Sequence, residues 1–235
     1  MNKLPAQKVD GLIHGMALLQ ELASEARPMS GLELSKRLEM SPVRVNRLLK
    51  TLAYLGYASQ TVSRKYVVGP AVHVIAAQTM KASGLLRYAF EYLELLNHEA
   101  PTVALGVLWK QKVCYLYHKS ATIQIYEGIG GASLYDADNS SVGLALLAEL
   151  SDPAIHEIYD DANIETLMER ITETRANGYA LLRHGEHYSM AMKIGVPSYA
   201  ALAVSGIKEK KQLEPLRAKL SEYSQKIQEK GELKC

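Results

Sequence analysis

Apolar residues in the first third of the chain recur every three or four positions, which is the spacing of one face of an α-helix. The pattern predicts helices over residues 10–26, 31–38 and 42–55. Ser30 and Glu33 have the spacing of a capping box, and Ser41-Pro42 is a second helix-start signal. The third helix is expected to turn one apolar stripe inward, made of Val45, Leu48, Leu49, Leu52 and Leu55.

After Gly56 the period changes from helical to β-type. Residues 57–60 and 65–68 are predicted to form a hairpin, whose tip is basic because it carries Arg64 and Lys65. Residues 71–83 are expected to form a connecting helix. These signals divide the chain into a small domain over 1–70, a linker helix over 71–83 and a larger domain over 84–235.

The larger domain alternates between the two periods. Strands are expected over 102–109, 112–118, 179–183, 189–196 and 199–205, and helices over 85–99, 140–150, 152–160, 162–177 and about 208–230. Residues 119–139 are predicted to be a loop. Strands paired mostly in hairpins and interleaved with helices predict an α+β fold with an antiparallel sheet.

Composition and charge narrow the function. The 48% hydrophobic and 22% charged residues are typical of a folded globular protein. Residues 1–81 carry a net charge of +6 and residues 82–235 a net charge of −4, which favours an anionic partner for the first part. Without a long apolar run or a secretion signal, a cytoplasmic protein with no membrane partner is expected. Cys114 and Cys235 are too few for a disulfide framework or a four-thiolate zinc site.

Two short helices, a tight turn and a basic hairpin together predict a winged helix-turn-helix, in which the second helix of the pair enters the major groove of DNA. Arginine and asparagine are the residue types that bind guanine and adenine edges, whereas lysine suits a phosphate. A merely solvated basic helix face is the alternative, but the combined order of signals favours DNA binding. The candidate DNA-binding residues are Ser41, Pro42, Val43, Arg44, Asn46, Arg47, Lys50, Arg64 and Lys65.

Motifs distributed over the whole chain carry a family resemblance. In the small domain they are Val45-Asn46-Arg47-Leu48-Leu49-Lys50-Thr51-Leu52 and Lys65-Tyr66-Val67-Val68-Gly69-Pro70. In the larger domain they are Gly143-Leu144-Ala145-Leu146-Leu147-Ala148, Asn177-Gly178-Tyr179-Ala180 and Ala201-Leu202-Ala203-Val204-Ser205-Gly206. With these motifs in this order, the chain resembles the IclR-type transcriptional regulators.

The resemblance implies a GAF-like (profilin-like) effector domain that binds a small, often carboxylate-bearing or aromatic metabolite and so alters DNA binding. It also implies a homodimer or a dimer of dimers, and it brings no cofactor. Carried over from the family, the candidate effector-binding residues are Ile129, Gly130, Gly131, Asp138, Ser140, Met192 and Ser205.

The chain also departs from the family pattern. Asp138-Asn139-Ser140 replaces the usual His-Ala-Thr, and Met192 or a neighbour takes the place of a pocket cysteine. Ser41-Pro42-Val43-Arg44 differs from the usual Pro-Lys-Ser-Thr, so a different operator sequence is expected. The altered pocket leaves open an alternative, a constitutive DNA-binding dimer whose effector domain has lost its ligand.

Three further groups of residues are candidates for a metal site or a catalytic site. The segment 184–187 holds two histidines and a glutamate. Cys114 and His118, four apart on a strand, are expected on the same face, and Asp136 and Asp138 would share a face if extended. None is accompanied by a third ligand, an orienting group or an oxyanion site. Polar loop residues and a buried strand cysteine are the favoured interpretation, so an enzyme is not expected. Some of the tyrosines between 115 and 199 are candidates to contact a ligand.

Overall fold

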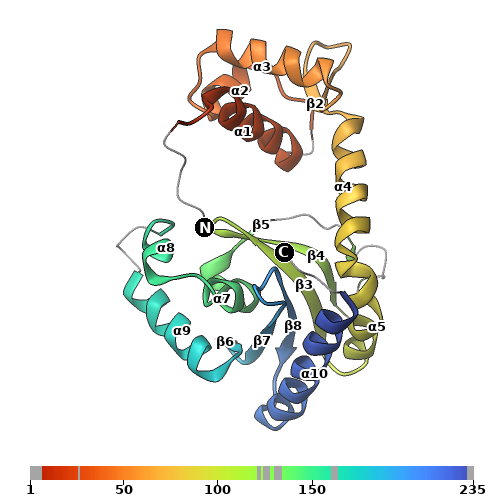
Figure 1. Ribbon diagram of the computed structural model, residues 1–235, viewed down its shortest axis with the longest axis vertical. Coiled ribbons are helices and arrows are strands. Elements are labelled where there is room, and N and C mark those ends of the chain that lie inside the picture. The colour runs from red at the N-terminus through yellow and green to blue at the C-terminus, as the bar shows by residue number, and fades with distance from the viewer. Residues whose placement is uncertain are drawn as a thin grey trace. The chain divides into compact units, whose positions relative to one another are not determined.

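A computed structural model describes residues 7–25, 27–120, 123, 128–129, 134–159 and 164–231 (Figure 1). The chain forms two compact units, residues 2–82 and 83–235. Among the described residues, no helix combines the length and the apolar character needed to cross a lipid bilayer.

The first unit is a winged helix-turn-helix. Its elements are α1 (Asp10–Glu25), α2 (Gly31–Arg37), α3 (Pro42–Tyr54), β1 (Ala58–Gln60), β2 (Tyr66–Val68) and α4, which begins at Pro70 and ends at Ser83. One core joins the three helices to the hairpin, and Leu18, Leu34, Val45 and Leu49 are almost completely buried in it. The apolar stripe of α3 therefore points inward as predicted, except that Leu55 follows α3 as its C-cap and is 53% exposed.

Two backbone contacts hold the hairpin against the helices. Met29 and Tyr66 exchange backbone hydrogen bonds of 2.9 and 2.7 Å, which adds a bridge from the α1–α2 connection to β2. Gly69 crosses Gly56 so closely that a Cβ atom on it would lie 2.2 Å from the Gly56 carbonyl oxygen. Only glycine fits at this crossing, where β2 leads into α4.

The second unit is an α+β fold around a six-stranded antiparallel sheet of order β5-β4-β3-β8-β7-β6. Its strands are β3 (Thr102–Trp109), β4 (Lys112–Ser120), β5 (Leu134–Asp136), β6 (Ala180–His184), β7 (His187–Ile194) and β8 (Ala200–Ile207). Its helices are α5 (Leu85–Asn97), η1 (Ala137–Asn139), α7 (Ser141–Leu147), α8 (Asp152–His156), α9 (Ile164–Asn177), η3 (Lys210–Gln212) and α10 (Leu213–Gly231).

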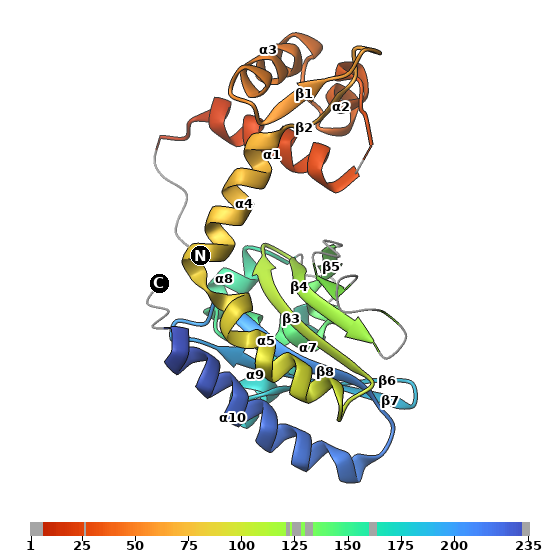
Figure 2. The ribbon, with the colours of Figure 1, turned by 90° about the vertical axis from the view of Figure 1, so that its right-hand side faces the viewer.

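Each face of this sheet has its own hydrophobic core. Helices α5 and α10 cover one face, where Leu93, Tyr117 and Leu220 are buried (Figure 2). Helices α7 and α9 cover the other face, where Leu147 and Ile171 are buried. The α+β fold with an antiparallel sheet was therefore predicted correctly.

Several boundaries differ from the prediction. Strand β5 lies inside the segment expected to be a loop, and it pairs with the start of β4, more than twenty residues earlier. Helix α8 is only five residues long, and α10 begins at Leu213, after a short 3-10 turn. Strand β7 begins at His187, two residues earlier than expected. Strand β5 is missed by the local pattern because its pairing partner is distant in the sequence.

A β-bulge in β4 changes which side chains share a face. Leu105 pairs with Tyr117 and the next residue of β3, Gly106, pairs with Tyr115, so Leu116 is an extra residue in the ladder. Tyr115 therefore packs on the α7 side of the sheet, whereas Tyr117 is buried on the α5 side.

Candidate nucleic-acid interface and ligand pocket

Helices α2 and α3 each begin at the serine cap that the sequence predicted. The Ser30 hydroxyl accepts a hydrogen bond from the Glu33 backbone N–H at 3.1 Å, and the Ser41 hydroxyl accepts one from Arg44 at 3.3 Å. Between them Glu39 adopts a left-handed conformation with φ of 51°. Capping at both helix starts fixes where α3 begins and therefore which of its side chains point outward.

The outward face of α3 carries most of the residues predicted to bind DNA. Ser41, Pro42, Val43, Arg44, Asn46, Arg47 and Lys50 are all exposed. Val45, Leu49 and Leu52 are buried on the opposite face. Sequence reasoning missed Tyr54, which is 89% exposed and follows Lys50 by one helical turn.

Arg44 also contacts α1. Its Nη1 atom lies 3.5 Å from His14 Nδ1. Both side chains line a hollow between α1 and α3, together with Asp10 and Arg47. The contact brings His14 to the edge of the candidate interface, a placement that depends on the packing of α1 on α3.

The hairpin presents the two remaining predicted cations. Arg64 adopts a left-handed conformation with φ of 60° in the turn, and Lys65 follows it; both side chains are exposed. Thr61 closes the turn, because its backbone N–H donates to the Lys65 carbonyl oxygen at 2.8 Å. The tip is thus an ordered projection carrying two positive charges.

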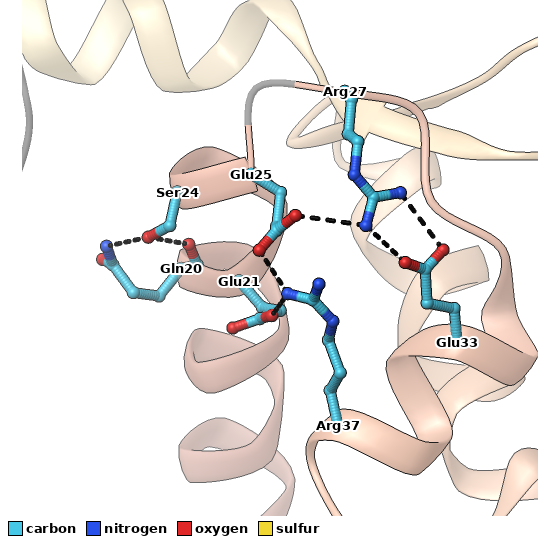
Figure 3. Close-up of polar contacts among 7 residues, drawn as sticks. All are labelled: Gln20, Glu21, Ser24, Glu25, Arg27, Glu33 and Arg37. Carbon is cyan, nitrogen blue, oxygen red and sulfur yellow. Dashed lines mark hydrogen bonds and ion pairs between the residues drawn. The ribbon is translucent and has the colours of Figure 1, made fainter.

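A second set of cations in this unit is engaged in ion pairs (Figure 3). Arg27 contacts Glu33 at 2.5 Å and Glu25 at 3.1 Å, and Arg37 contacts Glu21 at 2.7 Å and also Glu25. The Arg37 guanidinium lowers the pKa of the Glu25 carboxyl, and Arg27 lowers the pKa of Glu33 in the same way. This network, which the sequence did not reveal, joins the end of α1 to α2.

The contrast between the two sets defines the candidate interface. Within the described part of the chain, the cations of α3 and the hairpin tip have no ion-pair partner: Arg44, Arg47, Lys50, Arg64 and Lys65. Unpaired, solvated cations on a helix and an adjacent hairpin are what a polyanion requires. We call this set the basic surface.

In the second unit, hydroxyl groups gather where α7 begins. Ser140 caps α7, accepting a hydrogen bond from Gly143 N–H at 3.3 Å, and its Oγ lies 2.9 Å from the Tyr115 hydroxyl. Ser141 Oγ lies 2.6 Å from Ser189 Oγ. We call Tyr115, Ser140, Ser141 and Ser189 the hydroxyl cluster.

The structure brings only some of the predicted effector residues to this cluster. Ser140 belongs to it, and Ser205 is the cross-strand partner of Ser189. Asp138 is in η1, two residues before Ser140. Ile129 bridges to Tyr117. Gly130 and Gly131 lie outside the described residues.

Met192 is not brought to the hydroxyl cluster. It packs with the α5 and α10 core, on the opposite face of the sheet from α7. Successive side chains of β7 point to opposite faces of the sheet, so Ser189, three residues before Met192, lies on the α7 face. This alternation could have been used on the sequence to identify Ser189.

The hydroxyl cluster has aromatic neighbours. The Tyr115 ring lies 5.1 Å from that of His118 and 5.2 Å from that of Tyr135. Burial raises the pKa of Tyr115 and lowers the pKa of His118, so both are neutral near pH 7. The cluster therefore offers neutral hydrogen-bonding groups beside aromatic faces.

The groupings weighed for catalysis are not assembled. The bulge at Leu116 places Cys114 and His118 on opposite faces of the sheet, which corrects the expectation of a shared face. Burial raises the pKa of the Cys114 thiol, which disfavours the thiolate. Within the described ranges, no three His, Cys, Asp or Glu side chains are placed to hold a metal ion.

Comparison with known proteins relates the first unit to the IclR helix-turn-helix domain. The model of the IclR helix-turn-helix domain matches residues 11–61. The HTH-type transcriptional regulator BhcR of Paracoccus denitrificans is 30% identical over 164 residues, covering 63% of this chain and 58% of that protein. The match thus spans less than two thirds of that relative's length.

Two solved structures share the fold over nearly the whole chain. One, assigned to the IclR transcriptional regulators of Silicibacter sp. TM1040, has a TM-score of 0.81 at 22% identity and covers 96% of this chain and 97% of its own. The other is an IclR homolog of Microbacterium hydrocarbonoxydans complexed with 4-hydroxybenzoate. It has a TM-score of 0.68 at 18% identity, with 92% and 97% covered.

Proposed function

Since this chain belongs to the IclR-type transcriptional regulators, we propose that it binds an operator DNA through the basic surface and responds to a small metabolite through residues 84–235. The observation that carries the proposal is the unpaired state of the cations on α3 and the hairpin tip, while Arg27 and Arg37 nearby are neutralised. Residues 1–70 form the DNA-binding domain and residues 71–83 the linker helix in this proposal.

On the DNA, the side chains divide by chemistry. Asn46 and Arg47 lie near the start of α3 and suit adenine and guanine edges in the major groove, while the exposed Val43 suits a thymine methyl group. Lys50, one turn on from Arg47, and the hairpin cations suit phosphates. Arg44 adds a positive charge beside them, in the hollow that it lines together with His14.

The test is a binding titration against the DNA upstream of the protein's own gene and against a scrambled sequence. Arg47→Ala should reduce the preference for the operator, and Lys210→Ala, which removes an exposed cation of the second unit, should leave it unchanged. Equal binding to both DNAs by the unaltered protein would exclude sequence-specific recognition by α3.

In this proposal, a second copy of the chain covers an apolar groove in the first unit. The groove has a volume of about 550 Å³ and lies between α1, α3 and the first turns of α4. Leu12, Met16 and Ile75 line it and remain 63%, 57% and 48% exposed. Patches of this kind on a soluble domain mark interaction sites. In a dimer joined there, two recognition helices contact half-sites about 34 Å apart.

For the effector, the hydroxyl cluster and its aromatic neighbours support a small polar or aromatic metabolite. The M. hydrocarbonoxydans homolog contains 4-hydroxybenzoate, which has both features. The effector must bind the DNA-competent and DNA-incompetent states with different affinity. Adding a pooled metabolite extract to the titration should shift operator binding, and Ser140→Ala should reduce that shift.

One observation favours the alternative of a constitutive DNA-binding dimer. The hydroxyls of the cluster already pair with one another, Tyr115 with Ser140 and Ser141 with Ser189, so they are satisfied without a ligand. Operator binding that no extract alters, together with an unchanged melting temperature in the same extract, would support this alternative.

A further inference from the structure

Arg44 is contacted by a histidine from a different helix. Its Nη1 atom lies 3.5 Å from His14 Nδ1, a long hydrogen bond that links the first turn of α3 to α1. Arginine has donors but no acceptor, so Arg44 donates in this contact and Nδ1 accepts. An imidazole that accepts through Nδ1 is neutral and carries its proton on Nε2. The contact therefore requires the neutral form of His14.

This contact lies in a hollow at the start of α3. The hollow has a volume of about 420 Å³, and its lining includes His14 from α1 and Val43, Arg44 and Arg47 from α3. Both arginines are exposed, whereas His14 is half-buried. The packing of α1 on α3 thus provides a fixed support beside a long, exposed side chain.

No carboxylate neutralises Arg44 in the hollow. Asp10 is the acidic residue of the lining, but it forms no ion pair with either arginine among the residues that the structure describes. Within the same part of the chain, the Nε and Nη2 atoms of Arg44 have no hydrogen-bond partner. Arg44 therefore keeps its charge and one unoccupied edge of its guanidinium, formed by Nε and Nη2.

The unoccupied edge suits a guanine. Two parallel N–H donors of a guanidinium match the O6 and N7 acceptors that guanine presents in the major groove. Residues at the start of a recognition helix are the ones that contact base edges, and Arg44 lies in the first turn of α3. A guanidinium that is already held at Nη1 loses less conformational freedom on binding, so it binds guanine more tightly than an unsupported one.

We propose that His14 is a positioning residue for base recognition, which holds Arg44 at Nη1 so that Nε and Nη2 bind one guanine in each half-site. The inference rests on the proposed function, because it requires α3 to enter the major groove of an operator. It adds a residue of α1, outside the α2–α3 pair and the hairpin, to those that determine the operator sequence.

The experiment is selection of bound sequences from a randomised double-stranded DNA library, followed by anisotropy titration of the selected DNA with the full chain. Arg44→Ala should lose the preference for guanine at one position of each half-site and keep the position that depends on Arg47. His14→Ala should weaken binding to the selected DNA roughly threefold to tenfold per half-site, but not binding to DNA in which that guanine is replaced. Alanine favours a helix, so an unchanged melting temperature should show that α1 is retained.

Two further substitutions separate the ring nitrogens of His14. His14→Asn places an amide oxygen near the position of Nδ1 and should retain the guanine preference, whereas His14→Gln places its amide near Nε2 and should not. In the Arg44→Ala background, His14→Ala should have no further effect, because the two side chains act as one unit. His73→Ala removes an exposed histidine of α4 outside the hollow and is the matched control, with preference and affinity unchanged.

The proposal is overturned if His14→Ala keeps the original preference and affinity, or if it weakens the selected and the guanine-replaced DNA equally, because His14 would then act through the fold or through a phosphate. It is also overturned if His14→Gln rather than His14→Asn retains the preference. A library selection that Arg47→Ala alters and His14→Ala does not would overturn this inference alone. Failure of the proposed function has a different result: the unaltered chain would select no sequence, and this inference would fall with it.

Discussion

Replacing Lys50 and Arg47 separately should change operator binding in two different ways. Both side chains extend from the exposed face of α3 without an ion-pair partner among the described residues. Lys50 is placed for a phosphate and Arg47 for a base edge. Lys50→Ala should therefore alter the salt dependence of binding, whereas Arg47→Ala should alter sequence preference.

The magnitude follows from the number of unpaired cations assigned to phosphates. Lys50, Arg64 and Lys65 give three contacts per chain and six in a dimer, so log Kobs should fall with log salt with a slope of about −5.4. Lys50→Ala removes two contacts from the dimer and should bring the slope to about −3.6. Between 50 and 200 mM salt, the loss of affinity should shrink from roughly 10³-fold to roughly 10²-fold.

The assay is fluorescence anisotropy of labelled operator and scrambled DNA over that salt range. For Arg47→Ala, the operator should lose about 1–3 kcal/mol per half-site relative to the scrambled DNA. Lys210→Ala, in the second unit, is the control and should keep both the slope and the preference.

Two results would refute this reasoning. A slope unchanged by Lys50→Ala would show that Lys50 does not neutralise a phosphate. An Arg47→Ala variant that loses the same affinity on both DNAs would remove the base-contacting role of Arg47, and with it the proposed orientation of α3.

Three other predictions concern the two units. Gly143→Ala should destabilise the chain by about 1–3 kcal/mol in urea unfolding, since its Cβ would lie 2.0 Å from the Ala137 carbonyl oxygen; an unchanged midpoint would contradict the close packing of η1 on α7. Met16→Glu should weaken dimerisation through the first unit, so binding to a two-half-site operator should fall well below that of the unaltered chain while binding to a single half-site persists. The folded pKa of Glu25 is lowered from 4.5, so the stability that Glu25 contributes is complete above its unfolded pKa and is lost as the pH falls through its folded pKa. Arg37→Gln should therefore reduce the difference between the urea midpoints measured at pH 7 and below pH 4.5. An equal difference in both proteins would exclude the ion pair as its source.

The features that were predicted correctly depend on neighbouring residues. Ser30 and Ser41-Pro42 signal helix starts through contacts three residues away, so the helix-turn-helix and its outward face follow from local chemistry. The α+β character of the second unit follows from the hydrophobic period, for the same reason.

The features that were missed depend on distant partners. The hydroxyl cluster joins Tyr115, Ser140 and Ser189, which come from three separate elements and show no shared pattern in the sequence. Met192 packs in the α5 and α10 core because of the face of β7 on which it lies. Cys114 and His118 do not share a strand face as expected, because the bulge between them cannot be recognised from residue type. The Arg27 and Arg37 network likewise requires α1 and α2 to be packed first.

The extra residue in β4 also has a consequence for comparing relatives. Because Leu116 occupies the ladder without a partner, a relative with a regular strand needs one residue fewer at this point, and its alignment to this chain requires a gap there. An ungapped alignment would assign every position from Tyr117 to the end of β4 to the wrong side of the sheet. Transfer of binding residues between relatives across this strand is therefore safe only after the length of the strand has been matched.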